Sequence, residues 1–260
     1  MSSIPTGRIL WFETLCRDAA RMRDFYAAVC EWTIVGWPMG GGGMYEMFAA
    51  GGVPVGALQP FPASAPAEHR ANAHWLPYFA AADVDATAAS VRRLGGTVWV
   101  EPNTIPSVGR MAVVADRTGA DFALHCPDAP PPAPAPAPAI GHVSWVECNV
   151  PDIAQALSDY GELFGWTAAR RIEMGQMGAY QLVHHEGRDI GGFYQSANGE
   201  LAPWRWMCYV RVGDLDAAFA RATSLGASVV MEPHEVPTGG ARIAMLRDPE
   251  GAAFGLQWNA

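Results

Sequence analysis

The sequence predicts an α+β fold in which four βαβββ units pair into two similar domains. Three observations carry this prediction. A Pro/Ala-rich segment divides the 260-residue chain near its middle. The segments on either side of it match each other in sequence, and each half passes twice through the same order of strand-like and helix-like patterns.

From Asp128 to Ala139 the chain reads DAPPPAPAPAPA. Proline fixes φ and lacks an N–H donor, so this segment can be neither a helix interior nor a central strand. Alternating Pro and Ala favour an extended polyproline II spacer. We therefore expect a domain over 1–127, a linker over 128–139 and a second domain over 140–260. A long surface loop inside one domain is the alternative.

The two halves are internal copies of each other. The first begins GRILWFETLCRDAARMRDFYAAVCEW and the second begins GHVSWVECNVPDIAQALSDYGELFGW. At one constant spacing the matched pairs are Trp11 with Trp145, Glu13 with Glu147, Asp18 with Asp152, Tyr26 with Tyr160, and Trp32 with Trp166. The match resumes later, where YFAAADVDATAASVRRLGGTVWVEP aligns with YVRVGDLDAAFARATSLGASVVMEP. A repeat of this length indicates duplication of a whole structural unit.

Each half also contains two units of its own. In the first, a strand over 8–14 leads into a helix over about 18–30, which Asp18 can cap, and strand-like YEMFAA and VPVGALQP follow. The next unit repeats the order with strand WLPYFAA, a helix from Asp83 to the Gly95-Gly96 stop, strand TVWVEP and the hairpin RMAVVADRTGADFALH. The turn DRTG and its counterpart DPEG have the composition of tight turns.

Composition limits the classes of partner. Half of the residues are hydrophobic, which is enough for a packed globular core. The net charge is −9 and nucleic-acid binding needs clustered Lys and Arg, so we do not expect nucleic acid as a partner. The start of the chain lacks a signal-peptide pattern and no stretch approaches the roughly 20 apolar residues that span a bilayer, so we expect no membrane partner. Five cysteines without CxxC spacing favour free thiols in a reducing cytoplasm. We expect a cytoplasmic monomer or homodimer that handles a small molecule.

The motifs WFE…D…FY…W, ADVDA…LGG and VADRTGADFAL, with their second copies, resemble those of the vicinal oxygen chelate superfamily. That superfamily includes glyoxalase I, extradiol dioxygenases, and bleomycin- and fosfomycin-resistance proteins. The resemblance covers nearly all of both halves. It implies two glyoxalase-like domains, each with a curved sheet around a cleft, and it leaves the reaction open because the fold hosts several chemistries.

The resemblance also implies where a divalent metal would be held. Members of the superfamily commonly use His or Gln on a first strand and Glu on a last strand. The first-strand positions here are Trp11, Leu76, Trp145 and Met207, and the last-strand positions are Ala123 and Gly255. None of these side chains can ligate such a metal. We therefore expect neither a metal nor a cofactor.

Strand alternation then predicts which side chains share the cleft face. We expect catalytic groups at Glu13, Glu147, Tyr78, Tyr209 and His125, and substrate-binding groups at Trp11, Trp145, Gln257, Arg110 and Arg242. A carboxylate between an indole and a sheet is poorly solvated, so its pKa tends to rise towards the range useful for proton transfer. The structural alternative is that the two glutamates only accept hydrogen bonds, from the backbone or from the two arginines.

Two functional hypotheses follow. The first is a metal-independent lyase or isomerase that acts on a small carbonyl-containing or aromatic metabolite, with Glu13 or Glu147 as the base. The second is a non-catalytic protein that binds and sequesters a small hydrophobic compound, as antibiotic-resistance members of the superfamily do. A metal-dependent glyoxalase or dioxygenase comes third, because it needs ligands that these positions do not supply.

Overall fold

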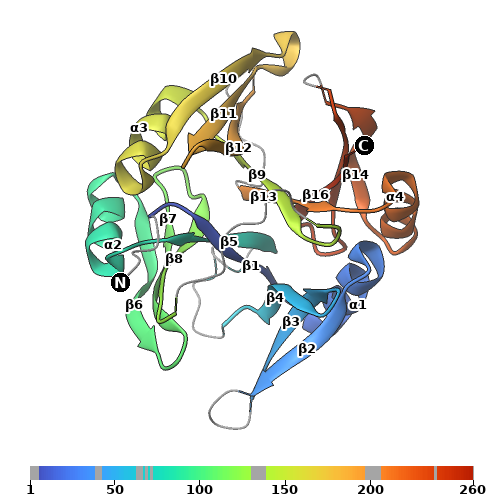
Figure 1. Ribbon diagram of the computed structural model, residues 1–260, viewed down its shortest axis with the longest axis horizontal. Coiled ribbons are helices and arrows are strands. Elements are labelled where there is room, and N and C mark those ends of the chain that lie inside the picture. The colour runs from blue at the N-terminus through green and yellow to red at the C-terminus, as the bar shows by residue number, and fades with distance from the viewer. Residues whose placement is uncertain are drawn as a thin grey trace. The chain divides into compact units, whose positions relative to one another are not determined.

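The structure is a computed structural model that describes residues 6–38, 43–62, 67, 70, 73–129, 139–196, 206–236 and 239–259. These residues form four repeats of the order strand, helix, three strands, and their sixteen strands belong to two eight-stranded sheets (Figure 1). The predicted α+β class with four βαβββ units is confirmed. Residues 130–138 of the Pro/Ala segment lie outside the described residues, so the expected domain boundaries stay predictions.

The first repeat consists of β1 (Ile9–Cys16), α1 (Ala19–Cys30), β2 (Thr33–Pro38), β3 (Met44–Ala50) and β4 (Val53–Pro60). The second consists of β5 (His74–Ala80), α2 (Val84–Arg93), β6 (Thr97–Ile105), β7 (Gly109–Ala115) and β8 (Asp121–Pro127). Within these repeats the hydrogen-bonded strand orders are β2-β3-β4-β1 and β5-β8-β7-β6. In these two repeats, β2 has no counterpart among the strands expected from the sequence, because TIVGWP lacks a clear apolar alternation.

The third repeat consists of β9 (Val143–Asn149), α3 (Ile153–Phe164), β10 (Thr167–Glu173), the 3₁₀ turn η1 (Gly175–Met177), β11 (Ala179–His185) and β12 (Arg188–Gln195). The fourth consists of β13 (Trp206–Arg211), α4 (Leu215–Ser224), β14 (Ser228–Glu235), β15 (Ala241–Arg247) and β16 (Ala253–Asn259). Their strand orders, β10-β11-β12-β9 and β13-β16-β15-β14, repeat those of the first half.

An aspartate begins each of the four helices. The side chain of Asp18 accepts a hydrogen bond from the Arg21 N–H, and Asp83, Asp152 and Asp214 cap their helices in the same way. Such a cap satisfies backbone donors that have no partner inside the helix. The four caps therefore fix the point at which each first strand turns into its helix.

The compact units of the structure do not pair the repeats in their order along the chain. One compact unit combines the second and third repeats (Leu76–Pro134 and Val146–Trp206), and the other combines the first and fourth (Phe12–Trp75 and Met207–Ala260). Helix contacts follow the same grouping, since α2 lies beside α3 and α1 beside α4 (Figure 1). Each unit therefore joins a repeat from one side of the Pro/Ala segment to a repeat from the other side.

A buried tyrosine lies at the centre of each unit. Tyr26 packs edge-on against Phe25, Trp75 and Phe254, and its Oη donates a 2.9 Å hydrogen bond to Asp248 Oδ2. In the other unit, Tyr160 stacks on Trp166 and donates a 3.0 Å bond to Asp116 Oδ2. Both aspartates begin the tight turns that the sequence identifies as DRTG and DPEG. The duplicated tyrosines thus make equivalent contacts, each with a turn of a different repeat.

The five cysteines carry free thiols, as expected from their spacing, and four of them are buried. Burial and the nearby acidic groups raise the pKa of Cys16 to about 12, so this thiol stays protonated at neutral pH. Among the helices that the structure describes, none combines the length and apolarity that a membrane span requires.

Candidate functional site

Glu13 of β1 and Tyr45 of β3 form a short carboxylate–phenol hydrogen bond in the first repeat. Tyr45 Oη donates to Glu13 Oε1 at 2.6 Å, and Glu13 is only 8% exposed. Hydrogen bonds to an ionised carboxylate are shorter and stronger than neutral ones. The sequence predicts Glu13 as a site residue but misses Tyr45. The available signal is that Tyr45 and its counterpart Tyr180 recur in the two halves, each shortly after a Gly-containing stretch of sequence.

The strand register places this pair on the sheet face that points away from the helix. Glu13 lies opposite Ala57 of β4, and Ala57 lies opposite Met47 of β3, two residues after Tyr45. Residues opposite each other or two apart share a face. Phe48, which follows Met47, points the other way, where it packs against Tyr26 of α1. The expected placement of Glu13 on the open face is therefore what the strands show.

Glu147 occupies the matching place in the third repeat. It lies opposite Gly192 of β12, and Gly192 lies opposite Leu182, two residues after Tyr180. A Cβ at Gly192 would lie 2.4 Å from the Tyr180 ring, so the ring covers this glycine, which lies opposite Glu147. Burial, and secondarily the charge of Glu147, raise the pKa of neighbouring Tyr194. The glutamate–tyrosine arrangement is thus duplicated together with the repeat.

Tyr78 and His125 lie together in the second repeat. Their ring centroids are 6.2 Å apart in an edge-to-face arrangement. Tyr78 lies opposite Ala123, two residues before His125, so both rings share one face of the sheet. His125 Nε2 lies 3.3 Å from the Val108 carbonyl oxygen, and burial lowers the pKa of the imidazole. At neutral pH this is a neutral imidazole beside a phenol.

The fourth repeat differs from the second at the matching positions. The ring of Tyr209 lies over Gly255, where a Cβ would be 2.0 Å from Tyr209 Cδ1. Gln257 stands where the second repeat has His125, and its Oε1 accepts a 2.6 Å hydrogen bond from Ser144 Oγ. Ser144 is a polar contact that sequence reasoning misses, because alternation with Trp145 predicts the opposite face for it.

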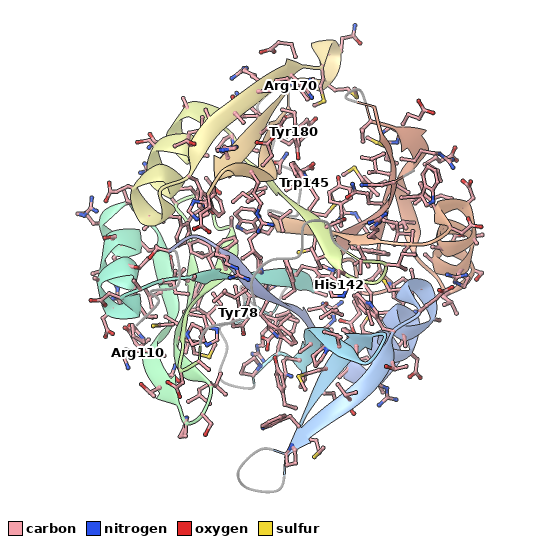
Figure 2. The ribbon with its side chains drawn as sticks, viewed as in Figure 1. Tyr78, Arg110, His142, Trp145, Arg170 and Tyr180 are labelled. Carbon is pink, nitrogen blue, oxygen red and sulfur yellow. The ribbon has the colours of Figure 1, made fainter. Side chains whose placement is uncertain are left out.

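Arg110 and Arg242 lie away from the other predicted site residues. The register pairs Met111 with His125, so Arg110, one residue earlier, points to the opposite face of the sheet, as Figure 2 shows by comparison with Tyr78. Arg110 pairs with Asp85 at the start of α2, and Arg242 pairs with Asp216 at the start of α4 at 2.9 and 3.0 Å. Since each guanidinium already binds a carboxylate beside its helix, we leave both arginines out of the proposed site.

Trp11 and Trp145 are both partly exposed. Each precedes its glutamate by two residues on the same strand, so alternation keeps the indole and the carboxylate on one face. Their predicted role as an aromatic wall stays a prediction.

The side chains at the family's metal positions do not fit a metal ion. Leu76 and Met207 are buried apolar residues, and at the last-strand position of the fourth repeat the Tyr209 ring fills the space above Gly255. Among the described residues, no three His, Cys, Asp or Glu side chains come together as a possible metal site. The donor chemistry of these strands therefore supports no step that runs through a metal.

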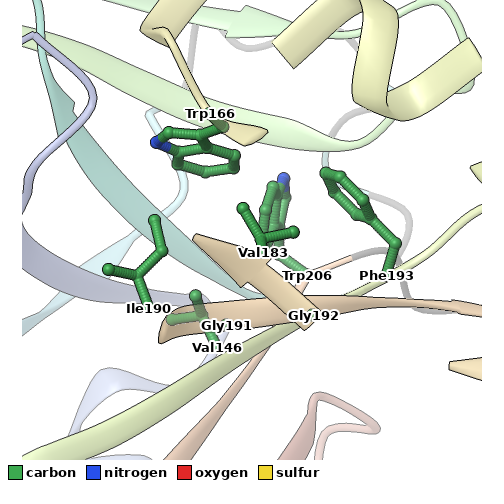
Figure 3. A pocket seen from close by; sticks show the side chains of 8 residues that line it. All are labelled: Val146, Trp166, Val183, Ile190, Gly191, Gly192, Phe193 and Trp206. Carbon is green, nitrogen blue, oxygen red and sulfur yellow. The ribbon is translucent and has the colours of Figure 1, made fainter. Parts of the chain in front are cut away.

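An apolar hollow lies inside the unit that contains the third repeat. Trp166, Trp206, Phe193 and neighbouring aliphatic residues line it (Figure 3). The hollow has no room for a water molecule and exposes no polar atom. It is a packing feature of the core, and we assign it no ligand.

The fold and this placement of polar groups on the helix-free sheet faces define a glyoxalase-type protein. The profile of the Glyoxalase/Bleomycin resistance protein/Dioxygenase superfamily matches residues 8–124 and 139–256. The chain belongs to this superfamily, which confirms the resemblance seen in the motifs.

Two relatives of similar length add detail. The chain is 32% identical to the anthracycline biosynthesis protein DauV of Streptomyces sp. (strain C5), over 98% of this chain and 94% of that protein. It is also 32% identical to the putative glyoxylase CFP32 of Mycobacterium tuberculosis (strain CDC 1551 / Oshkosh), over 95% of this chain and 92% of that protein.

Solved structures show the same fold at lower identity. The 2,2',3-trihydroxybiphenyl 1,2-dioxygenase of Sphingomonas wittichii strain RW1 matches with a TM-score of 0.66 and 15% identity, covering 98% of this chain and 91% of that one. The Mn(II)-bound glyoxalase of Novosphingobium aromaticivorans matches with a TM-score of 0.64 and 16% identity, covering 98% and 82%. At this identity the likeness concerns the fold alone.

Proposed function

We propose that this protein is a metal-independent lyase or isomerase that acts on an aromatic, carbonyl-bearing small molecule. Glu13 serves as the proton-transferring group and Tyr45 orients it. The observation that carries the proposal is the 2.6 Å hydrogen bond from Tyr45 Oη to the nearly buried Glu13 carboxylate, on the sheet face without helices.

This geometry suits proton transfer. A carboxylate next to a substrate carbonyl can take a proton from the adjacent carbon and return it elsewhere on the resulting enol, and such general acid–base steps typically contribute about 10²–10⁴-fold in rate. The Tyr45 hydroxyl fixes the orientation of the carboxylate, and orientation is what makes the transfer efficient. Glu147 with Tyr180 is the second candidate pair, because the same strands repeat the same arrangement.

The similarity to DauV favours the aromatic substrate class. An anthracycline skeleton is a planar, fused-ring quinone that carries phenol and ketone oxygens. Sheet faces that present Trp11 and Trp145 beside carboxylates offer apolar surface to the rings and hydrogen-bonding groups to the oxygens. We propose a cytoplasmic location for the protein, because five free thiols persist in a reducing compartment.

A non-catalytic binding protein is the alternative function. It is favoured by the family's bleomycin-resistance branch and by aromatic side chains on the same faces as the glutamates. Binding alone would use Glu13 as a hydrogen-bond acceptor for a ligand hydroxyl without any change in covalent structure.

Hydrogen exchange into a model ketone separates these functions. Wild-type protein is incubated in D₂O with 1-tetralone, an aryl ketone with exchangeable hydrogens, and deuterium uptake is followed by mass spectrometry. We expect exchange above the buffer rate, and its loss in Glu13→Gln with the melting temperature within a few degrees of wild type. Tyr45→Phe should slow the exchange without abolishing it. If wild type binds a hydroxyanthraquinone but never accelerates exchange, the binding alternative replaces the enzyme.

A further inference from the structure

Trp37, near the end of β2, is the most exposed large apolar side chain among the described residues. Its indole is 64% exposed. Met44 of β3 is 57% exposed, but it lies opposite Pro38 and next to Tyr45, so its side chain is on the other face of the hairpin. An exposed tryptophan on an edge strand adds nothing to the core, and aromatic side chains of this kind are typical contacts for planar ligands.

The register relates this indole to the Glu13–Tyr45 pair. Trp37 lies directly opposite Tyr45, and two residues away Val35 lies opposite Met47. Residues directly opposite in an antiparallel pair lie on the same face, with Cβ atoms about 4.5–5.5 Å apart. Trp37 therefore shares the helix-free face with Tyr45, and through Met47 and Ala57 with Glu13.

The strand order gives the span between the indole and the acid. Trp37 is on β2 and Glu13 is on β1, at opposite ends of the order β2-β3-β4-β1. Three interstrand spacings of about 4.8 Å give roughly 14 Å across the sheet, and the two-residue offset from Tyr45 to Met47 adds roughly 7 Å along it, so the backbones of Trp37 and Glu13 lie about 16 Å apart. The two side chains extend over part of this span, and three or four fused rings bridge more of the remainder than a single six-membered ring does.

We propose that Trp37 is a specificity-determining residue that stacks on the distal ring of a fused polycyclic substrate whose oxygen-bearing ring lies at Glu13 and Tyr45. The inference rests on the proposed function and narrows its substrate class from aromatic compounds in general to tricyclic or tetracyclic ones. A one-ring compound bound at Glu13 is too short to contact the Trp37 indole, so only a larger fused-ring compound gains this stacking contact.

Ile34 provides a matched control. It lies on the same strand and is 36% exposed, but it is opposite Phe48, whose ring packs towards α1. Ile34 and Trp37 are three residues apart in a strand, so alternation sends their side chains to opposite faces. Loss of Ile34 removes exposed apolar surface from the same hairpin without touching the face of Glu13.

Calorimetric titration with 1,2-dihydroxyanthraquinone, which has three fused rings, and with one-ring catechol tests the inference in the full-length protein. In Trp37→Ala, affinity for the anthraquinone should fall about three- to tenfold, as expected for loss of one aromatic stacking contact, while affinity for catechol stays within twofold. Trp37→Phe should retain most of the affinity, and Ile34→Ala should match wild type.

The inference is overturned if Trp37→Ala binds the anthraquinone as wild type does, or if Ile34→Ala loses as much affinity as Trp37→Ala. If either result is obtained while Glu13→Gln still abolishes ketone exchange, the proposed function stands and only the role of Trp37 is rejected. If wild type neither binds these probes nor accelerates exchange, both are overturned.

Discussion

Tyr26 donates a 2.9 Å hydrogen bond to Asp248, a residue 222 positions further along the chain, and both side chains are buried. The indole Nε1 of Trp75 donates in turn to Tyr26 Oη at 3.1 Å. Burial raises the pKa of Asp248, although the hydrogen bonds from Tyr26 and the turn's backbone oppose this shift. The bond joins the helix of the first repeat to the final turn of the fourth, and the equivalent bond from Tyr160 to Asp116 joins the third repeat to the second.

Removing the Tyr26 hydroxyl should destabilise the protein. Tyr26→Phe leaves Asp248 with one donor fewer and leaves the Trp75 N–H without its acceptor, which should cost about 1–3 kcal/mol. The measurement is the urea midpoint by circular dichroism. Tyr194→Phe is the control, because the Tyr194 hydroxyl bonds the Met177 carbonyl at the surface and its loss should cost less. Equal losses of stability in the two variants would show that the buried hydrogen bond contributes no more than the surface one.

The ion pair between Arg117 and Asp159 should matter more than that between Arg110 and Asp85. Asp159 is buried and accepts two bonds from Arg117, at 2.7 and 3.0 Å. Arg117→Met leaves this carboxylate buried without its cation, which should cost about 3 kcal/mol. Arg110→Met opens an exposed pair, which is typically worth about 0–1 kcal/mol. Chemical denaturation compares the two variants, and a similar loss in both would contradict the burial argument.

A methyl group at position 255 should displace the Tyr209 ring. In Gly255→Ala the added carbon would lie 2.0 Å from Tyr209 Cδ1, and overpacking of this kind typically costs about 1–3 kcal/mol. Thermal denaturation should show a lower midpoint. A second change, Tyr209→Ala, removes the clash, so the combined loss should be smaller than the sum of the two single losses. Strict additivity would mean that the ring and the glycine do not touch.

His125 should make stability fall on acidification. Its folded-state pKa lies below the unfolded value of about 6.5 because burial disfavours the imidazolium. Between these two pKa values the unfolded chain binds more protons, so stability is present above pH 6.5 and declines as pH drops through this window. His125→Gln, which introduces the residue found at position 257, should flatten that decline. Melting temperatures at pH 5 and pH 8 measure it.

A pH profile of His125→Gln that overlays wild type would show that the half-buried His125 imidazole is not the titrating group.

Local sequence was sufficient for the elements and for the faces of most strands. The constant spacing from Trp11 to Trp145 and from Tyr26 to Tyr160 exposed the duplication, because homologous repeats keep the same periodicity. The capping aspartates and the DRTG and DPEG turns located the helix starts and hairpins, because these signals act over only a few residues. Alternation then put Glu13 and Glu147 on the face away from the helices, as the strand registers show.

The tertiary structure decided which side chains contact one another. Tyr45 reaches Glu13 only because β3 and β4 align in one particular register with β1, and a shift of one residue would turn it to the other face. Arg110 points towards Asp85 at the start of α2, because strand alternation and the position of the helix put both side chains on one face. The sequence alone favoured a role for Arg110 in the site. Packing also joined Tyr26 to Asp248 across 222 residues. Local periodicity fixes which side of an element is apolar, but burial between elements chooses which repeat covers it.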